Sequence, residues 1–89
     1  MVSVTITTGN GDWPVSVSDT ALDAVLFDFN PSSSRDVGEI KALVAALISK
    51  MQVVQAKDDA RPAQKRTAAI AITDLEKVQM VAVKALFAK

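Results

Sequence analysis

The sequence contains no cysteine, histidine or tyrosine, and one tryptophan and three phenylalanines are its only aromatic residues. Without cysteine the chain has no disulfide, no thiolate nucleophile and no zinc–thiolate site. Without histidine it lacks the commonest general base and the commonest transition-metal ligand. The remaining carboxylates, basic groups, hydroxyls and amides are better suited to holding a ligand than to converting one. We therefore expect a binding protein rather than an enzyme, with no catalytic residues, no metal site and no cofactor.

Long hydrophobic runs are also missing. Charged residues such as Lys50, Asp74 and Lys84 interrupt every apolar stretch before it reaches the roughly 20 residues of a membrane span. The first four residues lack the basic start and apolar centre of a signal peptide. These features indicate a cytosolic protein without a membrane partner.

Basic residues are absent from the first third of the chain. Ten basic and ten acidic residues balance overall, but residues 1–30 carry four aspartates and no Lys or Arg, so residues 31–89 carry a net charge of +4. A neutral chain lacks the basic excess that holds a nucleic-acid backbone, so no DNA or RNA polymer is expected as a partner. The uneven distribution indicates either attraction within or between subunits, an anion site on the second part, or a dispersed solvated surface.

A β-hairpin is predicted over residues 2–17. Apolar β-branched residues alternate with Ser and Thr on both sides of the turn sequence Gly9–Asp12, which is strand periodicity around residues that accept a positive φ. An isolated two-stranded hairpin is marginal in water. Its apolar face must therefore pack against the rest of the chain or a second subunit; we expect that face to comprise Val2, Val4, Ile6, Val15 and Val17.

A short helix and an irregular segment follow the hairpin. Ser18 is a plausible N-cap with Asp19 in the first turn, which predicts a helix over about 19–25. Residues 26–29 alternate again and predict a third short strand or an extended connector. Pro31 ends this segment, because proline biases the preceding residue away from helix.

The second half of the chain has helical periodicity. Apolar residues recur at three- and four-residue steps after a serine N-cap, which predicts a helix over 34–57. A polar break follows, and Asp59 with Pro62 indicates the first turn of a second helix over about 60–87. We expect one α+β domain over 1–89: a small antiparallel β element with a short helix (1–31), then a long antiparallel two-helix hairpin (32–89).

The end of the second helix, residues 78–87, is apolar at almost every angle around its axis. Such a helix is buried on several sides. One partner helix covers a single stripe, so the other faces need either the β element or further copies of the chain. The pattern therefore predicts a homo-oligomer.

Two segments could hold an anionic ligand. Residues 27–35 combine two phenylalanines, an amide, three serines, a helix start and Arg35, as a nucleotide pocket would, or they are an N-cap with two core phenylalanines. Arg61, Lys65 and Arg66 share neighbouring parts of a helix face that could grip a phosphate, or they are a solvated helix end.

Other polar or aromatic positions stand out without a catalytic pattern. Four polar residues interrupt the apolar second helix and are expected to pair across subunits or with a ligand: Thr73, Asp74, Lys77 and Gln79. Trp13, beside the turn, is either hairpin core or a stacking surface. Asp74 and Glu76 point in different directions on a helix, so they are not an acid–base pair.

Three stretches in order, residues 27–32, 37–48 and 69–85, resemble the helical-hairpin family of phage anti-defence sponges that act against CBASS and Thoeris defence. The segment Phe29-Asn30-Pro31-Ser32 carries the first of these similarities. The similarity covers residues 27–88, and the β-rich N-terminus is more like the Thoeris branch. Val81 departs from the pattern, because many relatives carry Trp at that position.

The resemblance implies interlocked dimers, or hexamers built as trimers of dimers, in the cytoplasm of an infected bacterial host. It implies capture, without cleavage, of cyclic di- or trinucleotides or of glycosylated cyclic ADP-ribose signals. Asn30, Ser32, Thr73, Gln79 and Met80 match family motifs and are expected to contact the ligand. Phe29, Arg35, Lys65 and Arg66 are added to this set on their chemistry.

Two other functions remain open at this point. One is a helical-hairpin oligomer that scaffolds or inhibits another protein and binds no nucleotide. The other is hydrolysis of a cyclic nucleotide, which the lack of metal-ligating histidines disfavours.

Overall fold

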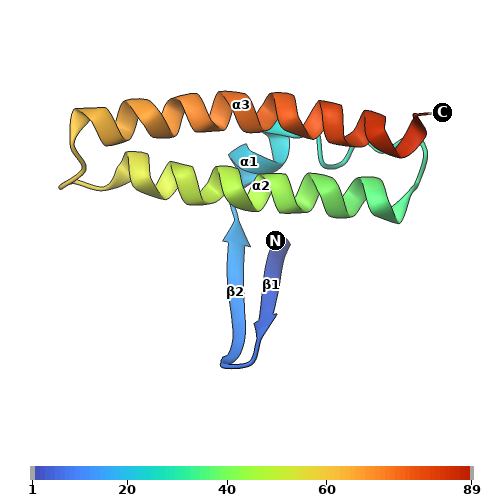
Figure 1. Cartoon of the computed structure of the whole chain (residues 1–89), viewed down its shortest axis with the longest axis horizontal. Helices are drawn as coiled ribbons and strands as arrows, with labels where there is room; N and C mark the ends of the chain where they lie inside the picture. The colour runs from blue at the N-terminus through green and yellow to red at the C-terminus, as the bar shows by residue number, and fades with distance from the viewer. Residues whose placement is uncertain (1, 89) are drawn as a thin grey trace.

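The computed structural model describes residues 2–88 and confirms the α+β organisation. In chain order its elements are β1 (Val2–Thr8), β2 (Gly11–Val17), α1 (Asp19–Ala24), α2 (Arg35–Ala56) and α3 (Pro62–Phe87). The long helices α2 and α3 lie side by side as an antiparallel hairpin, and the β-hairpin projects from the side of α2 (Figure 1). Among residues 2–88 no helix is long and apolar enough to cross a membrane.

Strands β1 and β2 form the predicted hairpin as a two-stranded antiparallel sheet. Val17 at its base is buried, and Val2, Val4 and Val15 pack against the core. Further out, Ile6 pairs with Trp13, and these side chains are 47% and 55% exposed. The base of the expected apolar face is therefore covered and its outer part is not. Trp13 belongs to that same face and is not hairpin core.

Helix α1 begins as predicted, but the segment after it is not a strand. Ser18 is the N-cap, and its hydroxyl accepts a hydrogen bond from the amide of Ala21 at 3.1 Å. Within the described residues the sheet contains only β1 and β2, so the expected third strand or extended connector over residues 26–29 is wrong. Leu26 instead adopts a φ of +52°, and the chain turns there because of the hydrogen bonds that end α1.

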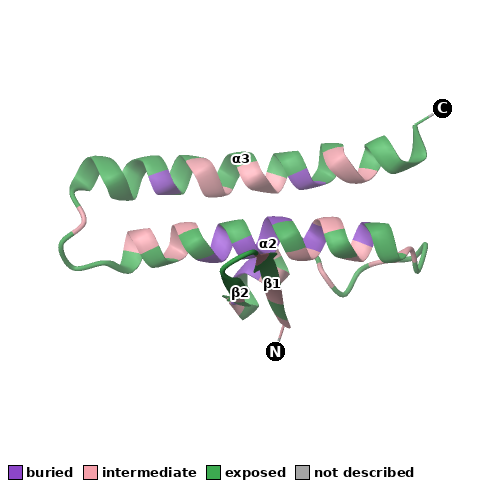
Figure 2. Cartoon of the chain, turned by 60° about the horizontal axis from the view of Figure 1, so that its bottom comes forward, coloured by how far each residue is buried: buried purple, intermediate pink, exposed green. Residues whose placement is uncertain are grey.

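Helix α2 is the centre of the molecule, because it packs against each of the other four elements. Its buried residues recur along the middle and first half of the helix (Figure 2). Ile48 is fully buried there with Ala45, beside Val25 and Ala21 of the α1 region. This small cluster of aliphatic side chains is the hydrophobic core.

Polar groups join the base of the hairpin to α2. The Ser18 backbone amide donates to the Ser49 hydroxyl at 2.9 Å, and the Gln52 side-chain amide donates to the Thr20 hydroxyl at 2.9 Å. The Ser18 hydroxyl also donates to Gln52. The N-cap of α1 is thereby fixed to the middle of α2, which sets the direction in which the hairpin leaves the helices.

The long helices start and end close to the predicted positions. Ser34 caps α2 by accepting from the Val37 amide at 3.4 Å. Helix α3 begins at Pro62 with Arg61 as its N-cap, so Asp59 lies in the connecting loop and not in the first turn. Pro62 suits the first helical position because its missing N–H would have no partner there.

Candidate functional site

The proposed nucleotide segment starts with the turn that ends α1. The Phe27 amide donates to the Leu22 carbonyl at 3.0 Å and the Leu26 amide to the Asp23 carbonyl at 3.1 Å, which is the bonding of a Schellman motif. Leu26 occupies the left-handed position where glycine is usual, at a cost of about 1 kcal/mol. The turn places Phe27 against the core and leaves Phe29 65% exposed.

Lys41 of α2 binds the backbone of this turn. It was not among the predicted site residues. It is only 5% exposed, and its ammonium group donates to the carbonyls of Leu26, at 2.9 Å, and of Phe29. The ammonium nitrogen lies 5.8 Å from the centre of the Phe29 ring, within the range of a cation–π interaction. An exposed aromatic ring and a cation therefore occur together at the start of α2.

The sequence did carry a signal for Lys41. It continues the buried stripe of α2, because Val37 stands four positions before it and Val44 and Ile48 stand three and seven after it. A charged residue on the buried face of a helix needs polar partners. Here the partners are carbonyls of a turn whose position could not be read from the helix pattern.

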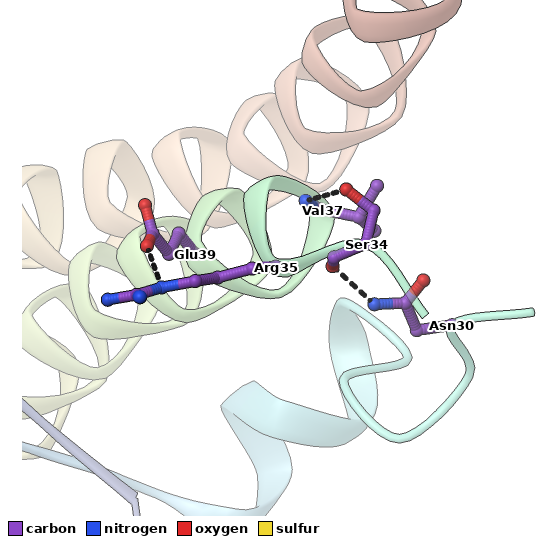
Figure 3. A network of polar contacts seen from close by, with 5 residues as sticks. All are labelled: Asn30, Ser34, Arg35, Val37 and Glu39. Atoms are coloured by element: carbon purple, nitrogen blue, oxygen red, sulfur yellow. Dashed lines mark hydrogen bonds and ion pairs between the residues drawn. The ribbon is translucent and has the colours of Figure 1, made fainter. Parts of the chain in front are cut away.

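Asn30 and Ser32 shape the loop before α2, and Figure 3 shows the contact between Asn30 and Ser34. The Asn30 amide group donates to the Ser34 carbonyl at 2.8 Å, and its oxygen accepts from the Ser32 hydroxyl at 2.8 Å. The Ser32 hydroxyl also accepts from the Ser34 amide at 3.2 Å. Both predicted contact residues thus order the N-terminus of α2, and each keeps hydrogen-bonding capacity for a ligand because an amide or hydroxyl can form further bonds.

Arg35 lies in the first turn of α2 with its side chain 91% exposed. Its Nε donates to Glu39 at 2.8 Å across one helical turn. The contact uses Nε, so the terminal guanidinium nitrogens remain available as donors to an anion. One interpretation of residues 27–35 was an N-cap with two core phenylalanines. The N-cap is confirmed, but only one of the two phenylalanines packs against the core.

Lys65 and Arg66 are exposed in the first turns of α3. The Gln64 side chain accepts from the Arg61 backbone amide at 2.7 Å, so the N-terminus of this helix is ordered by its own residues. Thr73, further along α3, donates its hydroxyl to the Ala69 carbonyl at 3.2 Å. These exposed groups face solvent in a single chain.

Gln79 and Met80 lie in the second half of α3 and point in different directions. Gln79 is 8% exposed, whereas Met80 is 57% exposed. Figure 1 shows that α2 and α3 are antiparallel, so the second half of α3, which contains Gln79, lies beside the first half of α2. It is therefore at the same end of the molecule as Phe29, Asn30 and Arg35.

One chain does not bring all the predicted contacts together. Phe29, Asn30, Ser32 and Arg35 lie at the end of the helical hairpin where α2 begins, and Lys65 and Arg66 lie at the opposite end, where α3 begins. From Arg66 to Met80 the axial distance is about 20 Å at 1.5 Å per residue. A small ligand cannot contact both groups within one chain.

Surface hollows touch the predicted set at Phe29. A hollow of about 320 Å³ lies between α1 and the following turn and is lined by Leu22, Leu26 and Phe29 among others. A hollow of about 570 Å³ between β2 and α2 is lined largely by apolar groups and holds none of the predicted contacts. The first hollow offers the aromatic ring of Phe29, but its charged lining residues are Asp23 and Asp28, so a cation for a phosphate has to come from outside it.

Comparison with known protein families gives a match over most of the chain. Residues 20–87 match the family model described as Acb2/Tad1, hairpin domain. The chain belongs to the Acb2/Tad1 hairpin-domain family. No curated protein and no solved structure matches it.

The Acb2/Tad1 hairpin domain is the domain of the anti-CBASS and anti-Thoeris sponge proteins, so the chain is of the anti-defence sponge kind. The matched span begins inside α1 and ends at the last residue of α3. It contains every predicted ligand residue and also Lys41. The β-hairpin of residues 2–17 lies outside it and is a separate feature of this chain.

Proposed function

We propose that this protein captures cyclic nucleotide signals of bacterial immunity and holds them without cleaving them. The ligand class is cyclic di- or trinucleotides or glycosylated cyclic ADP-ribose, and the effect is to block CBASS or Thoeris signalling in the cytoplasm of an infected bacterium. Membership of the Acb2/Tad1 hairpin-domain family supports this proposal.

The observation that carries the proposal is the exposed ring of Phe29 on a turn that Lys41 holds in place. The ring is exposed and can stack on a base, and the buried Lys41 ammonium fixes the turn through the Leu26 and Phe29 carbonyls. The Arg35 side chain, 91% exposed, provides the positive charge for a phosphate. Arg35 and the N-terminal amides of α2 lie in the same region and favour an anion there. Cyclic nucleotides combine these two features, a base and a phosphate diester, within a small molecule.

The site is proposed to be completed by a second copy of the chain. Lys65 and Arg66 lie too far from Phe29 to share a small ligand within one chain, and α3 exposes Ile70, Val78 and Val81. Covering this apolar surface with another helical hairpin would bring basic residues of one copy towards the aromatic end of another. We therefore propose a homo-oligomer, a dimer or a hexamer built as a trimer of dimers, with ligand sites between subunits.

Sequestration works by mass action and needs no chemical step. The protein must hold the signal at a concentration below the one that activates the host effector. Nanomolar binding corresponds to about −12 kcal/mol, which stacking and several charge-assisted hydrogen bonds can supply. A chain without histidine or cysteine is adequate for this task.

A capture experiment tests the proposal. Purified protein is incubated with a panel of cyclic di- and trinucleotides and cyclic ADP-ribose isomers, and the unbound ligand is measured; heating then releases what was bound. Depletion of one class followed by recovery of the intact molecule supports sequestration. Recovery of a cleaved product would indicate an enzyme, and no depletion of any signal would leave the protein-interaction function as the better proposal.

Two matched variant pairs locate the site. Phe29→Ala should weaken capture by roughly tenfold or more, the loss expected from one stacked base, whereas Trp13→Ala removes a similarly exposed ring (55%) on the β-hairpin and should leave capture unchanged. Arg66→Glu should abolish capture without changing the mass of the assembly. Ser16→Glu, which also introduces a carboxylate, should change neither the capture nor the mass. Unchanged capture in Phe29→Ala and Arg66→Glu would remove these residues from the site.

A further inference from the structure

The outer edge of β1 is the least protected hydrogen-bonding surface of the hairpin. Thr8 and Gly11 flank a two-residue turn and form a hydrogen-bonded pair, so hydrogen-bonded and non-hydrogen-bonded pairs alternate from there along the hairpin. Thr5 and Pro14 then form a non-hydrogen-bonded pair, whose backbone groups point away from the partner strand. The N–H and C=O groups of Ser3, Thr5 and Thr7 all face outward in the same way.

The two edges of this sheet differ. On β2 the outward positions are Asp12, Pro14 and Ser16; the proline has no N–H to donate, and a charged residue and a proline are common means of blocking an edge. On β1 no charged side chain occurs anywhere between residues 2 and 11. One edge is blocked against strand addition, and the other is open over three consecutive outward residues.

The exposed side chains point to what covers the open edge. Ile6 and Trp13 form a cross-strand pair on the apolar face, but both remain about half exposed because the core reaches only the base of the hairpin. A two-stranded sheet is marginal by itself, and three or more strands with a hydrophobic face are needed for stability. Additional strands beside β1 would extend this apolar face.

We propose that the β1 strands of two copies of this chain pair with each other across a two-fold axis at Thr5, forming one four-stranded antiparallel sheet. An edge paired with itself matches every donor with an acceptor. Ser3 of each copy then lies opposite Thr7 of the other, and Val4 opposite Ile6, so the two apolar faces continue on the same side. No like charges meet, because β1 carries none.

A second copy suits this edge better than an unrelated partner does. It brings an identical open edge, whereas its β2 edge is blocked, so strand addition at this sheet stops at two copies and does not continue into a β-fibre. The helices of the two copies leave from opposite ends of the sheet, because the strands are antiparallel. This interface lies outside the span of the family match, residues 20–87, and does not depend on the proposed ligand.

Cross-linking through a single introduced thiol tests the pairing without any nucleotide. The chain has no cysteine, so Thr5→Cys introduces a unique thiol. The two Cα atoms would be about 5.5 Å apart in a hydrogen-bonded pair, inside the range of disulfides, and oxidation should give a covalent dimer. Ser16→Cys is the control on the other edge, where three strand spacings separate the copies by about 14 Å, and it should not cross-link.

Amide hydrogen exchange gives a second test on the unmodified chain. The outward amides of Ser3, Thr5 and Thr7 should exchange at least about tenfold more slowly than those of Asp12 and Ser16, and dilution should remove this protection. Thr5→Pro, which removes one outward N–H but no bond between β1 and β2, should abolish the protection of Ser3 and Thr7, whereas Thr5→Val should keep it.

The outcomes decide between the alternatives. Cross-linking of the Thr5→Cys variant alone, together with protection on β1, supports the two-fold pairing, whether or not the protein captures nucleotides. Equal cross-linking of both variants, no cross-linking of Thr5→Cys, or equally fast exchange on the two edges would overturn it. Circular dichroism of each variant verifies that the helices remain folded.

Discussion

Helices α2 and α3 pack against each other along their length, but they use their apolar residues differently. Seven residues of α2 are buried, against two of α3. Helix α2 contacts α3 on one side and the hairpin and α1 on another, whereas Ile70, Val78, Met80 and Val81 of α3 remain more than half exposed. Two helices of similar composition therefore differ in how many neighbours a single chain supplies.

This difference separates two sources of stability. The α2 side holds the core of the single chain, so changes there should act on folding. If the exposed side of α3 packs against another copy as proposed, changes there should affect assembly and leave the single chain folded. Substitutions of the same chemistry on the two helices can test this distinction.

The largest expected effect is on folding, from Ile48→Ala in α2. This side chain is fully buried, and removing it should lower the free energy of unfolding by about 3 kcal/mol, a large share of the total for a domain of this size. The matched change Ile70→Ala in α3, where the side chain is 55% exposed, should cost less than about 1 kcal/mol. Urea unfolding at low protein concentration measures both.

A charge on the α3 surface should act on assembly instead. Val81→Glu, at a side chain that is 58% exposed, should keep the helical signal but weaken association through α3 by about 100-fold or more, because a carboxylate would have to be buried between copies. Ser16→Glu adds the same charge on β2 and should leave the mass unchanged. Sedimentation measures the mass; a wild-type monomer at micromolar concentration would contradict the proposed role of α3.

Removing one hydroxyl from each helix gives a smaller contrast. Ser49→Ala in α2 leaves the Ser18 amide without its 2.9 Å acceptor and should cost about 1 kcal/mol. Thr73→Ala in α3 removes an exposed hydroxyl bonded to its own helix, and its effect on the same unfolding curve should be within about 0.5 kcal/mol. Equal losses would show that α3 is as constrained as α2.

The smallest expected effect has the opposite sign. Gly38 lies in α2, and a Cβ added there would meet no atom within 4 Å, so Gly38→Ala should raise the free energy of unfolding by about 0.5–1 kcal/mol. Thermal melting of the two proteins checks this. A loss of stability that grows with protein concentration would show that another copy approaches α2 at this point.

Local sequence patterns predicted much of this fold. The alternation around Gly9–Asp12 predicted β1 and β2, Ser18 was the predicted N-cap of α1, and the serine cap predicted for α2 is Ser34. These features depend on neighbouring residues, because strand alternation, turns and caps are short-range. The predicted helix over 34–57 accordingly differs from α2 by one residue at each end.

Residues whose partners are distant in sequence were predicted less well. The alternation at 26–29 favoured a strand, but the hydrogen bonds of the α1 terminus and the Lys41 ammonium make it a turn. Lys41 is far in sequence from the carbonyls that it binds. Its role near Phe29 therefore became visible only when α2 and the loop were placed together.

The sequence by itself determined the elements, the caps and the kind of chemistry available, because periodicity and composition are properties of local segments. It also determined that α3 has more apolar surface than one neighbour can cover. Only the tertiary structure decided which surfaces stay uncovered, that the hairpin packs on α2 and not on α3, and that Lys41 lies beneath an exposed phenylalanine. Packing decides these features because burial depends on which elements meet in space, and that information is not contained in any single segment.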